Sequence, residues 1–427
     1  MNILIVSYEA WRETNNGGNV LSNIFTAFPE AEIAQVYCCG ERPQNSVCRK
    51  YFQISDSMLL SKQKGQRLPE CDYSADPDTQ STVLENRIKG RIPALFKETS
   101  LLARELLWVL FDWKTDALKQ FVLDFQPDLI FAPCYSYFHV SKLALYIKQT
   151  AQCPMISYIS DDNYSLKQFR LSPSFWINRV ITRKWIRRHF SQCALVYTMT
   201  ELQKKEYTAK FGRPMKILCK SAEFEERNRE IGEPIQFIYA GGLYLNRWKI
   251  LSQLGKVLET LNSTGLKAQL HIYSGSRLRE REAMSLNDNQ NTFLHGAIPY
   301  RELMERYRNA DVAIHAEAFD LKNRLLTRLS FSTKIIDCMS SGCAILAIGP
   351  AGQAGISYLR DHDAAVCVSN MKELHTSVAG LIADKEQIRA YSRKAYELGR
   401  RNHIKSRIDE GIRQDFSAIV HSGTIQD

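Results

Sequence analysis

The amino-acid sequence predicts an α/β protein made of two doubly wound, Rossmann-like domains. Short β-branched runs alternate with helical stretches along the chain, which is typical of parallel α/β sheets. A strand followed by a glycine loop stands near the N-terminus, and the same arrangement returns near residue 240. The 427 residues are enough for two such domains, each with its own core.

Eleven segments are expected to be strands of these two sheets. They are residues 2–6, 32–37, 128–132, 155–159, 195–199, 236–240, 268–273, 292–294, 312–315, 344–347 and 365–368. Chain breakers and charges cluster between 211 and 234, so we expect the domain boundary there. This gives an N-terminal domain (1–215), a C-terminal domain (216–400) and a helical extension (401–427).

Two other stretches stand apart from the strand pattern. Residues 55–100 are polar and predict a long insertion into the first domain, because loops of this size are usually functional or disordered. Residues 388–420 carry Arg, Lys and Glu at helical spacing and predict an exposed helix.

Composition narrows the class of protein. Apolar residues make up 44% and charged residues 24% of the chain, without a run of eighteen uncharged apolar residues, so we expect no membrane span. The first residues read as a buried strand without a basic leader, so we expect no signal peptide. Eleven cysteines without a C-x-x-C spacing favour a reducing cytoplasm over disulfides or zinc. The net charge of +10 favours an acidic partner, and we expect no nucleic acid because no recognition module accompanies it.

The most informative segment is 331–347 (FSTKIIDCMSSGCAILA), which predicts a short helix, a glycine stop and a buried strand. Ser332 or Thr333 is expected to cap the helix, whose first N–H groups would bind an anion. Lys334 and Asp337 share one helix face and suit a nucleotide, with the diphosphate at Lys334 and the ribose hydroxyls at Asp337. The alternative is a capped helix with a solvated Lys–Asp pair.

Paired glycines follow the first strand of each predicted domain. Gly17 and Gly18 precede a helical pattern in the first domain, and Gly241 and Gly242 do so in the second, where Arg247 and Lys249 come next. Such glycines let the backbone approach a ligand, and two cations at the carboxyl edge of a parallel sheet suit a diphosphate. Tight turns and solvated cations are the alternatives. The G-x-G-x-x-G fingerprint is absent, which disfavours a hydride-transfer enzyme.

Together, these segments resemble the nucleotide-sugar glycosyltransferases of the glycosyltransferase-B fold, and in motif style those of retaining family four. Six segments match in order along most of the chain. They are Gly17-Gly18, residues 125–130 (FQPDLI), residues 198–212 (TMTE with Tyr207, Phe211 and Gly212), residues 241–247 (GGL with Arg247), residues 293–311 (FLHGAIP with Tyr307, Ala310 and Asp311) and residues 332–344.

The resemblance implies two Rossmann-like domains that face a cleft, with the acceptor on the first and the nucleoside diphosphate sugar on the second. It implies glycosyl transfer to a hydroxyl with retention of configuration, by an enzyme of the hexosyltransferase type. Gly296 and Ile298 would then contact the donor, while Arg247 and Lys334 would neutralise the departing diphosphate. We expect neither a cofactor nor a metal, since these cations would do the work of a divalent ion.

The chain departs from the family pattern at its two acids. Asp337 stands at the second glutamate, but Leu329 occupies the first, so Glu317 or Asp320 would have to supply that carboxylate. Arg247 replaces the lysine of the donor loop and keeps its charge. In the first domain, Asp161 and Asp162 end a buried strand, where one of them would orient the substrates; a helix N-cap is the alternative.

Residues Pro173 to Phe190 form a basic and aromatic amphipathic pattern. Such a helix can lie on an anionic membrane, which suggests a peripheral enzyme on the cytoplasmic face and a lipid-linked or growing glycan of a surface polysaccharide as acceptor. Ordinary packing on the sheet is the alternative. The histidines at 139, 271, 295 and 315 look isolated. A sugar-nucleotide epimerase of the same fold and an inactive nucleotide-sugar-binding protein remain rival functions.

Overall fold

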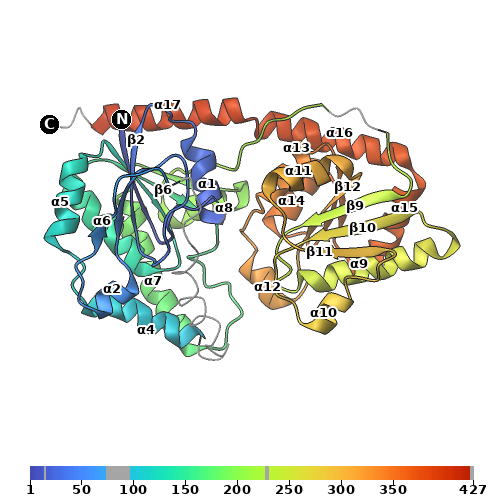
Figure 1. Ribbon diagram of the computed structural model, residues 1–427, viewed down its shortest axis with the longest axis horizontal. Coiled ribbons are helices and arrows are strands. Elements are labelled where there is room, and N and C mark those ends of the chain that lie inside the picture. Colours follow the sequence, from blue (N-terminus) through green and yellow to red (C-terminus); the bar gives the residue numbers. More distant parts are fainter. Residues whose placement is uncertain (14–15, 74–96, 227–229, 424–427) are drawn as a thin grey trace. The chain divides into compact units, whose positions relative to one another are not determined.

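A computed structural model describes residues 1–13, 16–73, 97–226 and 230–423 (Figure 1). The chain forms two compact units. Unit 1 comprises Met1–Leu166, Arg170–Leu218 and Asp409–Asp427, and unit 2 comprises Lys167–Phe169 and Cys219–Ile408. The division therefore falls three residues after the expected 215/216 boundary, and the end of the chain joins unit 1 instead of standing as a separate extension.

Unit 1 is built on an eight-stranded sheet of order β4-β3-β2-β1-β5-β6-β7-β8, parallel except where β4 meets β3. Its strands are β1 (Asn2–Ser7), β2 (Glu32–Tyr37), β3 (Lys50–Gln53), β4 (Gln66–Arg67), β5 (Leu129–Pro133), β6 (Met155–Ile159), β7 (Leu195–Thr198) and β8 (Lys216–Ile217). Ile3 pairs with Ile33 on one side and Leu129 on the other. Without the two-residue edge strands, the order is the 3-2-1-4-5-6 of a Rossmann fold.

The helices of unit 1 alternate with these strands. They are α1 (Asn16–Phe25), α2 (Asp56–Leu60), α4 (Lys97–Leu110), α5 (Asp116–Phe125), α6 (Phe138–Ala151), α7 (Pro173–Ser191), α8 (Glu201–Phe211) and, from Asp409 on, α17 (Lys405–Gly423). Within the predicted insertion 55–100, α2 and β4 lie at its start and α4 begins near its end, while 74–96 fall outside the described residues.

Unit 2 has a six-stranded, wholly parallel sheet of order β11-β10-β9-β12-β13-β14, again 3-2-1-4-5-6. The strands are β9 (Ile235–Ala240), β10 (Ala268–Tyr273), β11 (Thr292–His295), β12 (Val312–Ala316), β13 (Ala344–Ile348) and β14 (Val366–Val368). The helices are α9 (Arg247–Leu261), η1 (Asn262–Thr264), α10 (Glu280–Met284), α11 (Tyr300–Asn309), α12 (Leu321–Leu326), α13 (Lys334–Ser340), α14 (Ala354–Asp361), η2 (Met371–Glu373), α15 (Leu374–Ala383) and α16 (Lys385–Asn402).

The predicted fold class is confirmed, and all eleven expected segments are strands to within a residue or two. The sequence missed β3, β4 and β8, because these strands have two to four residues and gain their pairing only from the assembled sheet. The C-terminal stretch is helical, as predicted, but it forms two helices, α16 and α17, whose charged residues are mostly exposed and whose apolar residues are partly buried. Phe416 of α17 is fully buried against the rings of Phe25, Phe28 and Phe131. Among the described residues, none of the helices is long and apolar enough to span a bilayer.

Candidate functional site

The topology of unit 2 marks one place on its sheet for a ligand. Strands β9 and β12 are neighbours, and the strand order reverses between them. In doubly wound sheets, ligands bind outside the carboxyl ends of the strands at this switch point. Arg247 reaches it as the first residue of α9, after a turn in which Asn246 adopts a left-handed φ of 62°. Glu317 follows β12 directly, and Arg247 Nη2 donates to its Oε1 over 2.7 Å.

A third charged side chain joins this pair from α13. Lys334 lines the same small cavity of about 20 Å³ as Arg247 and Glu317. The other lining residues are Tyr239, Ala240, Ile314, His315, Ala316, Ser332, Ile335 and Cys338. Two cations and one carboxylate thus converge at the switch point, which leaves an excess positive charge where an anionic group of a ligand would lie.

Burial shifts the pKa of three side chains that line this cavity, Lys334, Glu317 and His315. Burial and the adjacent Arg247 charge lower the pKa of Lys334 to about 8. Burial raises the pKa of Glu317, although Arg247 and Lys334 both oppose the shift. Burial and the same two cations lower the pKa of His315 to about 3, so its imidazole is neutral. The Nε2 atom of His315 is buried and has no hydrogen-bond partner among the described residues. The sequence predicted an isolated histidine at this position, because only the fold places it beside the two cations.

The glycines of the donor loop make room for the protein's own side chains. Gly241 has a φ of +152°, and a Cβ atom there would lie 2.2 Å from Lys334 Nζ. A Cβ atom on Gly242 would lie 2.0 Å from the ring of Tyr244. Gly241 therefore leaves space for the end of the Lys334 side chain beside the switch point.

The expected capping of α13 is wrong. Thr333 occupies the N-cap position with φ −59° and ψ −19°, and it makes no side-chain capping bond. The amides of Ile335 and Ile336 donate instead to the carbonyls of Ser332 and Thr333, because the chain enters the helix through a tight turn. These N–H groups are already used, so the positive charge of this region comes from Arg247 and Lys334.

Asp337, the residue predicted to bind the ribose hydroxyls, is only 7% exposed. Its Oδ1 accepts from Lys220 Nζ at 2.6 Å and from Tyr300 Oη at 3.0 Å. The Lys220 ammonium also lies 5.2 Å from the centre of the Tyr300 ring. Lys220 and Tyr300 are neighbours that the sequence did not reveal, since they lie 117 and 37 residues away along the chain.

Asp337→Ala is therefore expected to reduce stability as well as nucleotide binding. Lys220 would be left mostly buried without its counter-charge, which costs about 2–3 kcal/mol in the free energy of unfolding. Denaturant unfolding measures this loss, and titration calorimetry with a nucleoside diphosphate measures affinity. Lys220→Met is the matched control, because it breaks the same ion pair but keeps the carboxylate that the ribose hydroxyls would use. An alanine variant with unchanged stability and unchanged affinity for the nucleoside diphosphate would contradict the assignment.

Three other residues assigned to the donor lie outside the cavity. Lys249 is exposed, with its ammonium 5.7 Å from the centre of the Trp248 ring, so the structure agrees with a solvated cation. Gly296 is exposed with open space around it, and Ile298 is half-buried. Both lie in the loop between β11 and α11.

Leu329 stands at the position where the family has its first glutamate. Leu329 is fully buried in unit 2, where a carboxylate would be strongly disfavoured. Glu317, in contrast, contacts Arg247 at the switch point. Asp320 caps α12 by accepting from the Asn323 amide, and it also accepts from Asn246 Nδ2 at 2.9 Å. Of the two candidates, the structure brings Glu317 to the cations.

In unit 1 the structure separates the two neighbouring aspartates. Asp162 is buried, accepts from the Ser165 amide at 2.8 Å and lies 3.8 Å from Arg179 Nη2. This anchoring role argues against Asp162 as a catalytic residue. Asp161 is exposed and is the carboxylate that a substrate could reach.

The glycine pair of unit 1 lies in the first turn of α1. Gly18 is buried, and a Cβ atom there would lie 1.9 Å from the carbonyl oxygen of Arg12. Gly18 is therefore needed because the chain passes close to the backbone of Arg12, and not because a ligand approaches it. Gly17 is half-buried in the same turn.

Helix α4 lies over the switch point of unit 1, between β1 and β5. The guanidinium of Arg104 lies 5.0 and 4.3 Å from the ring centres of Tyr8 and Tyr137, which follow these two strands. Its neighbour Glu105 is fully buried and accepts from the His139 ring and backbone. Burial raises the pKa of Glu105, but the bonds and charges of His139 and Arg104 outweigh it and lower that pKa overall.

The expectation of isolated histidines is therefore wrong for His139, and also for a pair in unit 2. His271 Nδ1 and His295 Nε2 lie 3.0 Å apart on the neighbouring strands β10 and β11. Their contact depends on the parallel register, which places residues 24 positions apart side by side.

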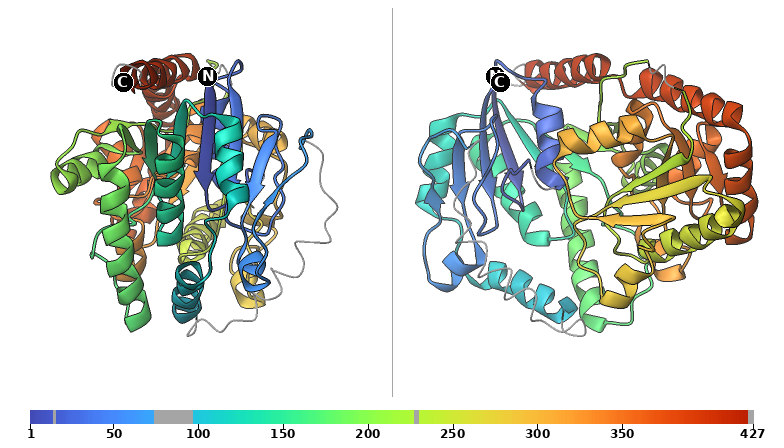
Figure 2. Two further views of the ribbon diagram at one scale, coloured as in Figure 1. Left: turned by 90° about the vertical axis from the view of Figure 1, so that its left-hand side faces the viewer. Right: turned by 45° about the vertical axis from the view of Figure 1, so that its right-hand side comes forward.

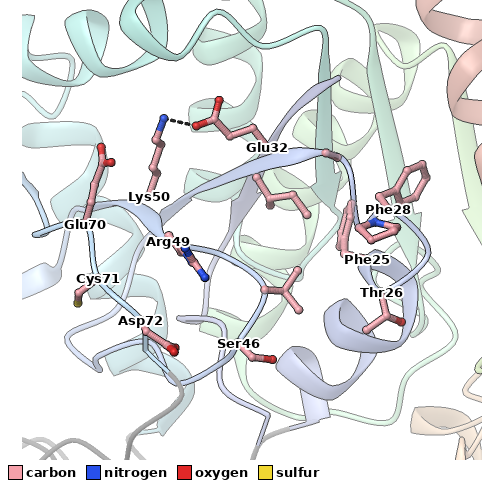
Figure 3. Close-up of a pocket in the computed structure, with 14 residues that line it drawn as sticks. Phe25, Thr26, Phe28, Glu32, Ser46, Arg49, Lys50, Glu70, Cys71 and Asp72 are labelled. Atoms are coloured by element: carbon pink, nitrogen blue, oxygen red, sulfur yellow. Dashed lines mark hydrogen bonds and ion pairs between the residues drawn. The ribbon is translucent and has the colours of Figure 1, made fainter.

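Unit 1 also has a larger hollow, of about 900 Å³, shown in Figure 3. It lies at Glu32 and Lys50, the first residues of β2 and β3, and these two form an ion pair. Ligands of doubly wound sheets bind at the opposite, carboxyl edge. Acidic and basic side chains both line the hollow, so its charge does not favour a nucleotide (Figure 3).

Comparison with known proteins identifies the fold. No family model matches the chain, and neither does any curated protein sequence. Among solved structures, HepE of Anabaena in complex with UDP has a TM-score of 0.62 at 12% identity, covering 98% of this chain and 100% of that one. Sucrose-phosphate synthase of Thermosynechococcus elongatus gives 0.63 at 14% identity, covering 99% and 100%. Trehalose 6-phosphate synthase of Burkholderia multivorans gives 0.62 at 10%, covering 99% of both. The protein has the glycosyltransferase-B fold, as expected.

Proposed function

We propose that this protein is a glycosyltransferase that moves a sugar from a nucleoside diphosphate sugar to a hydroxyl group. The observation that carries the proposal is the convergence of Arg247, Lys334 and Glu317 at the switch point of the unit 2 sheet. Structures of the similar HepE protein with UDP and with UDP-glucose support a ligand of this class. Membership of retaining family four stays a prediction.

In the proposed reaction, the bond between the anomeric carbon and the diphosphate oxygen breaks, and the acceptor oxygen bonds to that carbon and loses its proton. Arg247 and Lys334 would stabilise the negative charge that develops on the leaving diphosphate. Glu317 would hold Arg247 in place and face the transferred sugar. Unit 2 would bind the donor, and unit 1, with Asp161, would bind the acceptor. Retention of configuration is proposed from the motif resemblance.

The test offers the protein a panel of nucleoside diphosphate sugars together with soluble sugar acceptors. Transfer is measured by the release of the nucleoside diphosphate. Glu317→Gln should lower turnover about a hundredfold, by the loss of a charge from the reacting site. Asp320→Asn, which changes the acid at the N-cap of α12, is the matched control and should retain activity. Chelator should leave the rate intact if the cations replace a divalent ion. Interconversion of the sugar in the absence of an acceptor would favour an epimerase. Binding of UDP without turnover would favour an inactive binding protein.

We further propose that the acceptor is lipid-linked or a growing glycan of a surface polysaccharide, and that the enzyme works at the cytoplasmic face of a membrane. The segment Pro173 to Phe190 suggested this, and α7 spans it. Three arginines of α7 make contacts within unit 1. Arg179 is buried, and Arg183 and Arg187 donate to Tyr164, so charge alone does not make α7 a membrane helix.

A further inference from the structure

Helices α4 and α7 pack side by side in unit 1, beyond the carboxyl ends of its strands (Figures 1 and 2). The inner side of α4 carries Arg104, Glu105 and Trp108, which pack against the unit. Its outer side is apolar and exposed, which is unusual for a surface helix. The exposed fractions are 46% for Leu106, 52% for Val109, 77% for Leu110 and, on α7, 53% for Ile177 and 62% for Val180. We call these five residues the α4–α7 face.

Cations and aromatic rings accompany this face, at the end of α4 and along α6 and α7. Lys114 Nζ lies 5.7 and 5.5 Å from the ring centres of Trp113 and Tyr146. Lys142 and Arg188 flank the ring of Trp185 at 5.7 and 5.1 Å. Trp113 is buried, while Tyr146 and Trp185 are partly exposed.

Two of these cations are close enough to repel each other. Burial and the neighbouring charge of Lys114 lower the pKa of Lys142, and buried Glu105 opposes that shift only in part. Asp112, the acid on the same loop, accepts from the Lys114 backbone amide. An anion between Lys114 and Lys142 would relieve their repulsion.

From this juxtaposition we infer that the α4–α7 face is the surface by which the protein docks on a membrane containing anionic lipid. The apolar side chains enter the boundary between headgroups and acyl chains, and Lys114, Lys142 and Arg188 bind lipid phosphates. The strength of binding at a membrane interface grows with the apolar area buried and with the electrostatic attraction to anionic lipid, and an apolar surface and a basic patch occur together here. Aromatic rings that carry cations also suit the headgroup level.

The inference rests on the proposed function in one respect, namely that it explains how the enzyme meets a lipid-linked acceptor. Helix α4 has its apolar side outward and its polar side over the switch point of unit 1, where an acceptor would lie. Docking by this face would bring that edge of the sheet next to the lipid surface. A second copy of the chain is the other occupant to test.

The experiment is co-sedimentation of the full chain with vesicles of phosphatidylcholine, with and without phosphatidylserine. We expect binding to the anionic vesicles that weakens at high salt. Replacing Lys114 and Lys142 with Gln should lower it about thirtyfold, because each basic residue near such a surface contributes about 1 kcal/mol. Replacing Leu106 and Leu110 with Ser should lower it at least about tenfold.

Matched controls change the same residue types elsewhere on unit 1. Leu123→Ser alters a leucine on α5 that is 44% exposed, and Lys205→Gln with Lys210→Gln alters two exposed lysines on α8. All variants should melt at the temperature of the unaltered protein. The inference is overturned if the unaltered protein does not bind vesicles, or if the control variants lose as much vesicle binding as the test variants. If the unaltered protein self-associates and the leucine variant does not, the face belongs to a contact with a second copy. Transfer to a soluble acceptor is measured separately, so its absence would contradict the proposed function and leave the docking result standing.

Discussion

Replacing Lys334 with Met is expected to lower the rate of glycosyl transfer about a hundred- to a thousandfold while the protein stays folded. Removal of one preorganised group that stabilises developing negative charge typically has an effect of this size. Lys334 shares its cavity with Arg247 and Glu317, and Gly241 leaves it the space to do so. The measurement is turnover under saturating donor, together with a thermal melt of each variant. Lys249→Met, on the exposed side of α9, is the matched control and should lose little activity.

The pH dependence of UDP affinity gives this prediction a second readout. Because the pKa of Lys334 is lowered to about 8, its ammonium loses a proton as pH rises through that value. A diphosphate would bind the charged form, so UDP affinity should fall above about pH 8. Lys334→Arg keeps its charge over the whole range and should remove this fall. A flat profile between neutral pH and mildly alkaline pH in the unaltered protein, or the same fall in the Arg variant, would contradict the assignment.

Asp162→Ala is expected to lower the free energy of unfolding of unit 1 by about 3–5 kcal/mol, the usual cost of leaving a buried charge without its partner. Arg179 would lose the nearby carboxylate, although it still donates from Nε to the Ser165 carbonyl at 3.0 Å and from Nη2 to the Asp162 carbonyl at 2.5 Å. The hydroxyl of Tyr207 would lose an acceptor 3.3 Å away. A shift on the order of 10 °C in the first thermal transition follows from this range.

The neighbouring Asp161 provides the control for this experiment. It is exposed, so Asp161→Ala should leave the melting temperature unchanged and lower transfer, because it is the carboxylate open to substrate. The opposite result, with Asp161→Ala unfolding the protein and Asp162→Ala affecting only turnover, would show that the two roles had been assigned the wrong way round.

The sequence alone was sufficient for the fold class and the strand positions. Parallel strands covered on both faces must be apolar throughout, as Ile345, Leu346 and Ala347 of β13 are, and such runs are visible in one dimension. The alternation of these runs with helices limits the topology to the doubly wound class. The sequence also placed Lys334 at the start of a helix, where the structure finds it, and Arg247 in the turn before a helix of which it is the first residue.

Tertiary structure alone decided which charged groups meet. Glu317 contacts Arg247 across 70 residues, and Asp337 contacts Lys220 across 117, because strand order and register bring their loops together. Burial likewise depends on what packs over a residue, which no local pattern states. It turned Asp162 into an anchor and left the outer side of α4 exposed. The sequence determined that this protein has two doubly wound sheets, and only the folded chain determined which side chains stand at their switch points.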